Sequence, residues 1–219
     1  MESNKIKDTV VVNLFAGPGA GKTTCAWEIA SELKKRGIEA EYVSEYAKEM
    51  VWDNKIEKLD GSLENQRELY KEQLRRVQRL IGRVDVVVTD SPTLLSAMYL
   101  KQPNTEFQNE MLSDFKKFHN FNLFINRGKT YQQTGRIHSL DESIKIDNQI
   151  KTFLSDNHIY FGTYYHHTLN KVVDNIEKHL RNSNNNQDFI QSNCHHLPPP
   201  QNAPILPNEI PNVGFNQSM

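Results

Sequence analysis

The segment AGPGAGKTT, residues 16–24, decides the fold of this 219-residue chain. It has the spacing of a Walker A phosphate-binding loop, with Ala16 in the first position, where glycine is more usual. Before it, residues 9–15 (TVVVNLF) are β-rich and nearly all apolar, as in a strand that is buried on both faces. After it, residues 21–36 have the pattern of a helix that stops at Gly37. A loop of this composition between a buried strand and a helix is predicted to bind phosphate.

The chemistry of the loop follows from its backbone. Its glycines let the chain approach phosphate oxygens closely, and successive N–H groups at the start of a helix form an anion-binding nest. Lys22 is expected to reach the β- and γ-phosphates of a nucleoside triphosphate, and Thr23 to offer its hydroxyl to Mg²⁺. ATP is the expected nucleotide, because the chain has no N/T-K-x-D motif of the kind that reads guanine. The predicted nucleotide-binding residues are Gly17, Pro18, Gly19, Ala20, Gly21, Lys22, Thr23 and Thr24.

Beyond the loop, apolar runs alternate with amphipathic stretches. Further strands are expected over residues 39–44, 84–89, 121–126 and 159–163. Helices are expected over residues 45–53, 62–81, 139–156 and 169–180, and another is expected to start at Ser91-Pro92. This alternation predicts an α/β fold of the P-loop NTPase class, similar to nucleoside and nucleotide kinases, with a five-stranded, mostly parallel sheet and helices on both faces.

Two carboxylates follow predicted strands directly, at the edge where ligands of open parallel sheets bind. Asp90 has the position of a Walker B residue and is expected to bind Mg²⁺ together with Thr23; the alternative is that it only caps the next helix, for which Ser91 is better placed. Glu45 is a candidate base that would orient the phosphate acceptor. The alternatives are that Glu45 is an exposed first-turn glutamate, or that Asp90 is the base and Thr23 holds most of the metal.

Residues 127–138 (RGKTYQQTGRIH) form a polar, glycine-punctuated stretch before a helix with S-x-x-E capping-box spacing. In small kinases the corresponding loop closes over ATP, and its arginines stabilise the charge of the transferring phosphoryl group. Arg127 and Arg136 are the main candidates for this role, followed by Lys129, and the alternative is an ordinary surface loop. The predicted catalytic residues are Lys22, Glu45, Asp90, Arg127 and Arg136.

The composition limits the classes of partner and compartment. With 26 basic and 27 acidic residues, charge alone does not favour nucleic acid as a partner, although a local basic patch stays open. No apolar run reaches the roughly 18 residues of a membrane span, and the two cysteines are far apart, so a cytoplasmic protein is expected (the host cytoplasm, if the protein is phage-encoded). Residues 181–219 hold nine asparagines and six of the nine prolines. We therefore predict a domain over residues 1–180 and a disordered tail over residues 181–219.

The motifs together resemble the NadR-like AAA domain family, most closely its phage-encoded members. The resemblance rests on VVVNLFAGPGAGKTT, the E-Y-A-K-E element at 45–49, the V-V-V-T-D strand end, the R-x-K-x-Y-x-x-x-G-R stretch at 127–136 and E-S-x-x-I-D at 142–147. It implies ATP binding and phosphoryl transfer to a nucleoside-like or nucleotide-like acceptor. Residues 89–92 (TDSP) depart from the run of the nicotinamide riboside kinases and are closer to the carboxylate-x-S-P run of deoxynucleoside kinases.

The sequence leaves several functions open. The leading hypothesis is a kinase of a nucleoside, nucleotide or related ribosyl small molecule. One alternative is an ATP- or GTP-binding switch, or an ATPase module, without a small-molecule acceptor. Another is a kinase of a modified base in DNA, which the neutral charge balance disfavours. The oligomeric state is also open.

Overall fold

The computed structural model describes residues 7–128 and 139–193. The chain divides into two compact units, Met1–Asn184 and Asn185–Met219. The second unit contributes only the end of the last helix to the described residues. The strands of the described residues and the phosphate-binding loop lie in the first unit.

A five-stranded sheet forms the centre of the first unit, and every pairing in it is parallel. Its order is β2-β3-β1-β4-β5, so the strand that leads into the phosphate loop is the middle one. This confirms the predicted α/β fold with a parallel sheet. The strands are β1 (Val10–Phe15), β2 (Ala40–Val43), β3 (Val86–Thr89), β4 (His119–Ile125) and β5 (Gly162–Tyr164).

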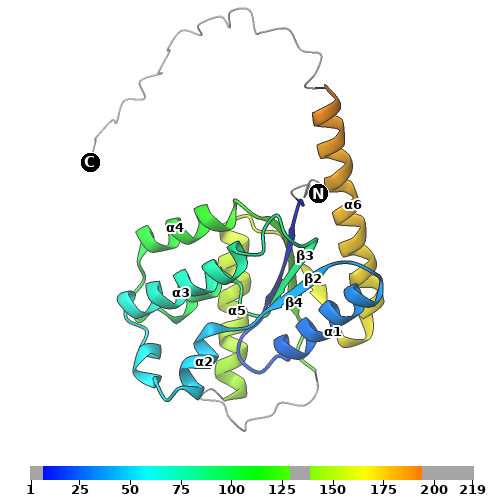
Figure 1. Ribbon diagram of the computed structural model, residues 1–219. Coiled ribbons are helices and arrows are strands. Elements are labelled where there is room, and N and C mark those ends of the chain that lie inside the picture. Colours follow the sequence, from blue (N-terminus) through cyan, green and yellow to red (C-terminus); the bar gives the residue numbers. More distant parts are fainter. Residues whose placement is uncertain (1–6, 129–138, 194–219) are drawn as a thin grey trace, which may run out of the picture. The chain divides into compact units, whose positions relative to one another are not determined.

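Helices cover the sheet on both faces, with α1 and α6 on one side and α3, α4 and α5 on the other (Figure 1). None of the described helices combines the length and the apolar character needed to cross a membrane. The α-helices are α1 (Lys22–Lys35), α2 (Tyr46–Trp52), α3 (Leu63–Gln78), α4 (Thr105–Phe115), α5 (Leu140–Asp156) and α6 (Leu169–Asn193). Three 3₁₀ helices complete the described chain: η1 (Ile56–Leu59), η2 (Thr93–Tyr99) and η3 (His166–Thr168).

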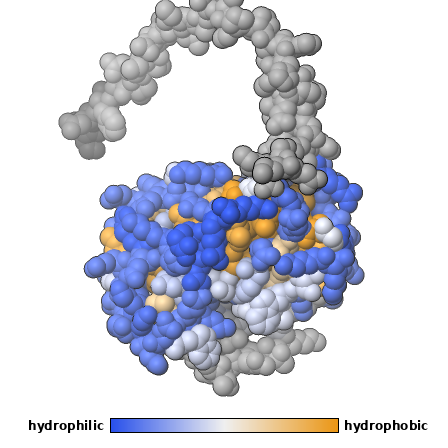
Figure 2. Space-filling model, in the orientation of Figure 1, coloured by the Kyte–Doolittle hydropathy of each residue, from blue (hydrophilic) through white to orange (hydrophobic). Residues whose placement is uncertain are grey.

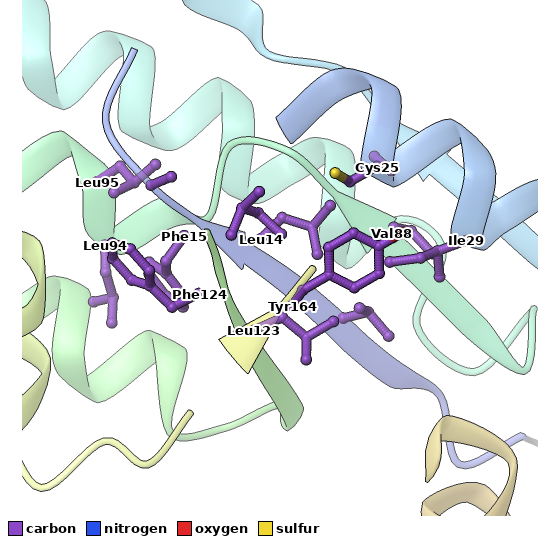
Figure 3. Close-up of a cluster of buried hydrophobic side chains, with 14 of the residues drawn as sticks. Leu14, Phe15, Cys25, Ile29, Val88, Leu94, Leu95, Leu123, Phe124 and Tyr164 are labelled. Carbon is purple, nitrogen blue, oxygen red and sulfur yellow. The ribbon is translucent and has the colours of Figure 1, made fainter. Parts of the chain in front are cut away.

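The core forms because β1 buries both of its faces. Leu14 points toward Cys25 and Ile29 of α1, whereas Phe15 points toward Leu94 of η2 on the other side (Figure 3). Phe15 also meets the ring of Phe115 edge-on, with the centroids 6.4 Å apart. On the face of the molecule shown in Figure 2, hydrophilic residues predominate and hydrophobic ones gather near the centre. Because β1 is buried on both faces, it requires a helical layer on each side.

One buried polar side chain interrupts β1. Asn13 is only 3 % exposed, and its amide donates to Oδ1 of Asn120 at 2.8 Å and to Oδ1 of Asn122 at 3.0 Å. Both partners lie on β4, which pairs with β1 in parallel. The amide is thus satisfied inside the sheet layer, as a buried polar group must be.

The helices differ from the sequence prediction at three places. The helix expected from Ser91-Pro92 is the 3₁₀ helix η2, which begins at Thr93 without a side-chain cap. The helix α4 is absent from the prediction, although Asn104 caps it by accepting from the N–H of Phe107 at 2.8 Å. The closing helix was expected to end near residue 180, but α6 continues to Asn193 because no glycine or proline interrupts the Asn-rich stretch before Pro198. The predicted capping box at Ser139 and Glu142 is confirmed.

The packing of α4 on α3 gives a stability prediction. The fully buried ring of Phe107 meets Tyr70 edge-on at a centroid distance of 5.4 Å. Phe107→Ala should therefore lower the free energy of unfolding by about 3–5 kcal/mol, because it leaves a cavity between two helices. Urea unfolding followed by circular dichroism measures this change. Tyr160→Ala is the control, because Tyr160 is 89 % exposed and its loss should change stability by less than about 0.5 kcal/mol. Equal effects of the two variants would contradict the packing described here.

Candidate active site

The phosphate loop connects β1 to α1 and takes the backbone shape that its glycines allow. Gly19 and Gly21 have φ angles of +78° and +90°, in the left-handed region that side chains disfavour. Gly21 is the N-terminal cap of α1, and the first turn of this helix contains no acidic residue. No acidic side chain of α1's own first turn therefore offsets the positive end of the helix dipole, which suits an anion.

Lys22 lies at the centre of the site. Its ammonium donates to the backbone oxygens of Ala16 at 2.8 Å and Gly17 at 3.1 Å. Burial lowers the pKa of Lys22, and the negative charges of Glu45, Asp90 and Asp147 oppose that shift. The fold therefore brings the predicted lysine and both predicted carboxylates into one electrostatic cluster, and it adds Asp147.

Asp90 follows β3 and is paired with the loop. It is 2 % exposed, and its Oδ2 accepts a hydrogen bond from Thr23 Oγ1 at 2.5 Å. A second donor, the hydroxyl of Tyr42 on β2, reaches the same oxygen at 2.9 Å. The other oxygen, Oδ1, is buried and has no hydrogen-bond partner within residues 7–128 and 139–193. Asp90 thus bonds to the loop itself, as a metal-binding partner of Thr23 would.

The residues around Asp90 suit a magnesium ion. Magnesium takes oxygen ligands, usually only one or two of them from protein carboxylates, and a buried carboxylate oxygen without a partner calls for a cation or a donor. Thr23 donates its proton to Asp90 and keeps its lone pairs available. The two residues predicted to bind metal therefore fit Mg²⁺ through Thr23 Oγ1 and Asp90 Oδ1.

Tyr42 is a member of this cluster that the sequence analysis missed. Burial and the charge of Asp90 raise the pKa of its phenol, so Tyr42 stays protonated and acts as a donor. The signal was weak, because a tyrosine in a short strand is an ordinary packing residue.

Glu45 is half-buried and occupies the N-cap position of α2, where its side chain makes no capping hydrogen bond. Burial raises the pKa of its carboxyl group, and nearby Lys22 partly offsets this. The buried amide of Gln73 on α3 binds the backbone on both sides of Glu45. It accepts from the N–H of Tyr46 at 2.9 Å and donates to the carbonyl oxygen of Ser44 at 3.2 Å. The first-turn glutamate paired with a cation is Glu49, which contacts Arg76 at 2.6 Å.

A third carboxylate, Asp147 of α5, bonds to the start of the phosphate loop. Its Oδ1 accepts from the N–H of Gly17 at 2.6 Å, and its Oδ2 is paired with Nε of Arg127. Arg127 also donates to the backbone oxygens of Pro18 at 2.7 Å and Ser143 at 3.0 Å. The sequence signal was the E-S-x-x-I-D element that contains Asp147.

Of the predicted lid, residues 127–138, the structure describes only the first two residues. Arg127 is described, and here its guanidinium binds the phosphate loop and Asp147. Its catalytic role stays a prediction. Arg136 and Lys129 lie outside the described residues.

Two shallow hollows on the described surface lie elsewhere. They share His158, Ile159 and Tyr160, which precede β5. One of them also includes Asn120 and Asn122 near the start of β4. The phosphate loop follows the carboxyl end of β1, so these hollows are not part of the site described above.

Solved structures with a similar fold are distant. Kti12 of Chaetomium thermophilum, in complex with ADP-AlF3, has 16% identity and a TM-score of 0.46, with 78% of this chain and 98% of that chain covered. The APS kinase CysC of Mycobacterium tuberculosis, in complex with AMPPNP and APS, has 12% identity, a TM-score of 0.46, and coverage of 80% and 99%. The deoxyadenosine kinase of M. mycoides has 12% identity, a TM-score of 0.45, and coverage of 82% and 99%. Likenesses at this level say nothing about the activity of this chain.

Comparison at the level of sequence gives a firmer result. No curated protein sequence matches the chain. Residues 11–168, however, match a family model described as an AAA domain, and this range contains the phosphate loop, Glu45, Asp90 and Asp147. Because the match extends over well more than half of the 219 residues, the chain belongs to this AAA domain family.

Proposed function

We propose that this protein is an ATP-dependent phosphotransferase whose acceptor is a hydroxyl or phosphate group of a nucleoside, a nucleotide or a related ribosyl small molecule. One observation carries the proposal: Lys22 of the phosphate loop is surrounded by a metal-type carboxylate, Asp90, and a separate half-buried carboxylate, Glu45. A module that only binds nucleotide needs the first of these carboxylates. The second, Glu45, is the base that a hydroxyl acceptor needs.

The phosphate side of the proposed reaction uses the loop. Its N–H groups and the ammonium of Lys22 bind the β- and γ-phosphates and stabilise the charge that develops during transfer. Thr23 Oγ1 and Asp90 Oδ1 are the oxygens that would hold Mg²⁺. When bound, the ion neutralises charge on the transferring group. The hydrogen bonds of Asp147 to Gly17 and of Arg127 to Pro18 hold the loop in place.

Glu45 serves the acceptor side. For a hydroxyl acceptor, the proton passes to the Glu45 carboxylate as the acceptor oxygen forms its bond to the γ-phosphorus, and the bond from that phosphorus to the bridging oxygen of ADP breaks. Glu45 suits this role better than Asp90, because Asp90 Oδ2 already accepts two hydrogen bonds, from Thr23 and Tyr42. A raised pKa also brings a carboxylate closer to the strength of an effective base.

The acceptor can be identified with purified protein, ATP·Mg²⁺ and a panel of nucleosides, nucleotides, nicotinamide riboside and hydroxymethylated DNA, with products followed by mass spectrometry. Lys22→Ala should lower kcat/KM by roughly 100-fold or more, because it removes a cation aimed at the transferring charge. Lys58→Ala is the matched control, since Lys58 pairs with Glu68 on the surface and should leave the rate unchanged.

Each outcome of this panel has a meaning. A product formed by the wild type and the Lys58 variant, but not by the Lys22 variant, supports the proposal and names the acceptor. ATP binding with no phosphorylated product across the panel contradicts it and favours the switch or ATPase alternative. Phosphorylation of the hydroxymethylated DNA alone would favour the alternative of a base kinase.

Replacing Glu45 or Glu49, the two glutamates of the E-Y-A-K-E element, by glutamine should shift Tm in opposite directions. Glu45→Gln should lower kcat roughly 10²–10⁴-fold. It should also abolish the acidic limb of the pH–kcat/KM profile, which reports the free enzyme, where burial raises the pKa of Glu45. The same change should raise Tm at neutral pH. Since the pKa of Glu45 is higher in the folded than in the unfolded protein, its ionisation opposes folding as pH rises.

Glu49→Gln is the matched control. Hydrogen bonds from Arg76 lower the pKa of Glu49, so the ionised form contributes stability that is lost as pH falls through the folded-state pKa. Glu49→Gln should therefore lower Tm at neutral pH and leave kcat within a few-fold. If both variants keep full kcat, Glu45 is not the base.

A further inference from the structure

Tyr42 and Thr23 converge on one oxygen of Asp90. The Tyr42 hydroxyl lies 2.9 Å from Oδ2, and Thr23 Oγ1 lies 2.5 Å from the same atom. Both groups donate to a carboxylate that is 2 % exposed, so both bonds are charge-assisted in a poorly solvated place. The carboxylate is planar. Two donors on Oδ2 therefore fix the direction in which Oδ1 points.

Thr23 alone would not fix this direction in the same way. As a proposed metal ligand, its hydroxyl must adjust when an ion binds, whereas the Tyr42 hydroxyl belongs to a rigid ring on a different element, β2. The ring is held in turn by Trp27 of α1, which meets it edge-on at 81° with a centroid distance of 6.2 Å. Tyr42 also packs against the main core cluster. Tyr42 is therefore a fixed donor, whereas the side chains of Thr23 and Asp90 can adjust.

We infer that Tyr42 is a positioning residue for magnesium, which acts through Asp90 by holding Oδ2 so that Oδ1 faces the ion. The inference rests on the magnesium site of the proposed function, but it does not depend on which acceptor is used. Trp27 is 58 % exposed and in edge contact with the Tyr42 ring, so its fluorescence is an internal reporter of this position.

The test is Tyr42→Phe, which keeps the ring against Trp27 and removes only the hydroxyl. Calorimetric titration with ATP in excess Mg²⁺ and again in EDTA gives the gain in affinity that magnesium provides. In the variant, the ratio of ATP affinity in Mg²⁺ to ATP affinity in EDTA should be roughly tenfold smaller than in the wild type. The affinity in EDTA should stay unchanged, since only the bond to the metal carboxylate is removed. In a steady-state assay the Mg²⁺ concentration for half-maximal rate should rise by a similar factor, with kcat at saturating Mg²⁺ nearly constant.

Fluorescence gives a reading that needs no turnover. The chain has two tryptophans, so Trp52→Phe leaves Trp27 as the only one. In that background, adding Mg²⁺ to the ATP-bound protein should change the emission of Trp27. With Tyr42→Phe added, the same change should require about tenfold more Mg²⁺.

The matched control is Tyr70→Phe. Tyr70 also donates its hydroxyl to a carboxylate, Asp114, at 2.7 Å, but on helices away from the phosphate loop. This variant should lower stability and leave the magnesium dependence at the wild-type value. The inference is overturned if Tyr42→Phe matches Tyr70→Phe in magnesium dependence, or if it weakens ATP binding equally with and without Mg²⁺. A failed acceptor panel would overturn the proposed function and leave these binding measurements intact.

Discussion

The site depends on a carboxylate that grips the phosphate loop from a distant part of the chain. Asp147, 6 % exposed, binds the N–H of Gly17 and the guanidinium of Arg127, which in turn holds the backbone oxygen of Pro18. A Cβ atom at Gly17 would lie 2.8 Å from the backbone oxygen of Ser143, so only glycine permits this close approach. The loop is therefore placed by β1 and α1 on one side and by α5 and the end of β4 on the other. The position of Lys22 follows from that placement.

Much of the fold could be predicted from the sequence, because its strongest signals are local. The apolar run of β1, the glycines after it and the helical pattern of α1 are contiguous, and Asp90 follows the next buried strand directly. The prediction failed where the local signal was weak or misread. The sequence signals α4 only through the Asn104 cap and a few apolar positions, and the proline before η2 predicts an α-helix where only 3₁₀ turns form.

The contacts inside the site could not be predicted in the same way. Gly17 and Asp147 are 130 positions apart, and Tyr42 and Asp90 are 48 apart. No local pattern fixes which side chains the strand order will bring to one edge. The sequence could nominate Arg127, Glu45 and Asp90, since each follows a predicted strand. It could not show that Arg127 would bind the loop backbone, or that Gln73 would hold the backbone on either side of Glu45.

The asparagine in the middle strand has a consequence for how the chain finds its structure. Three successive valines in β1 give little preference for one alignment with β4 over another, since a slip by two residues again places valine in the same layer. Asn13 reduces this ambiguity, because its amide bonds to both Asn120 and Asn122 in the observed alignment, and a slip by two residues moves it away from at least one of them. A misaligned strand would bury that amide without at least one of these partners, and an unpaired buried amide group costs about 1–3 kcal/mol. Asn13 thus favours the observed strand alignment at a position only three residues before the phosphate loop begins.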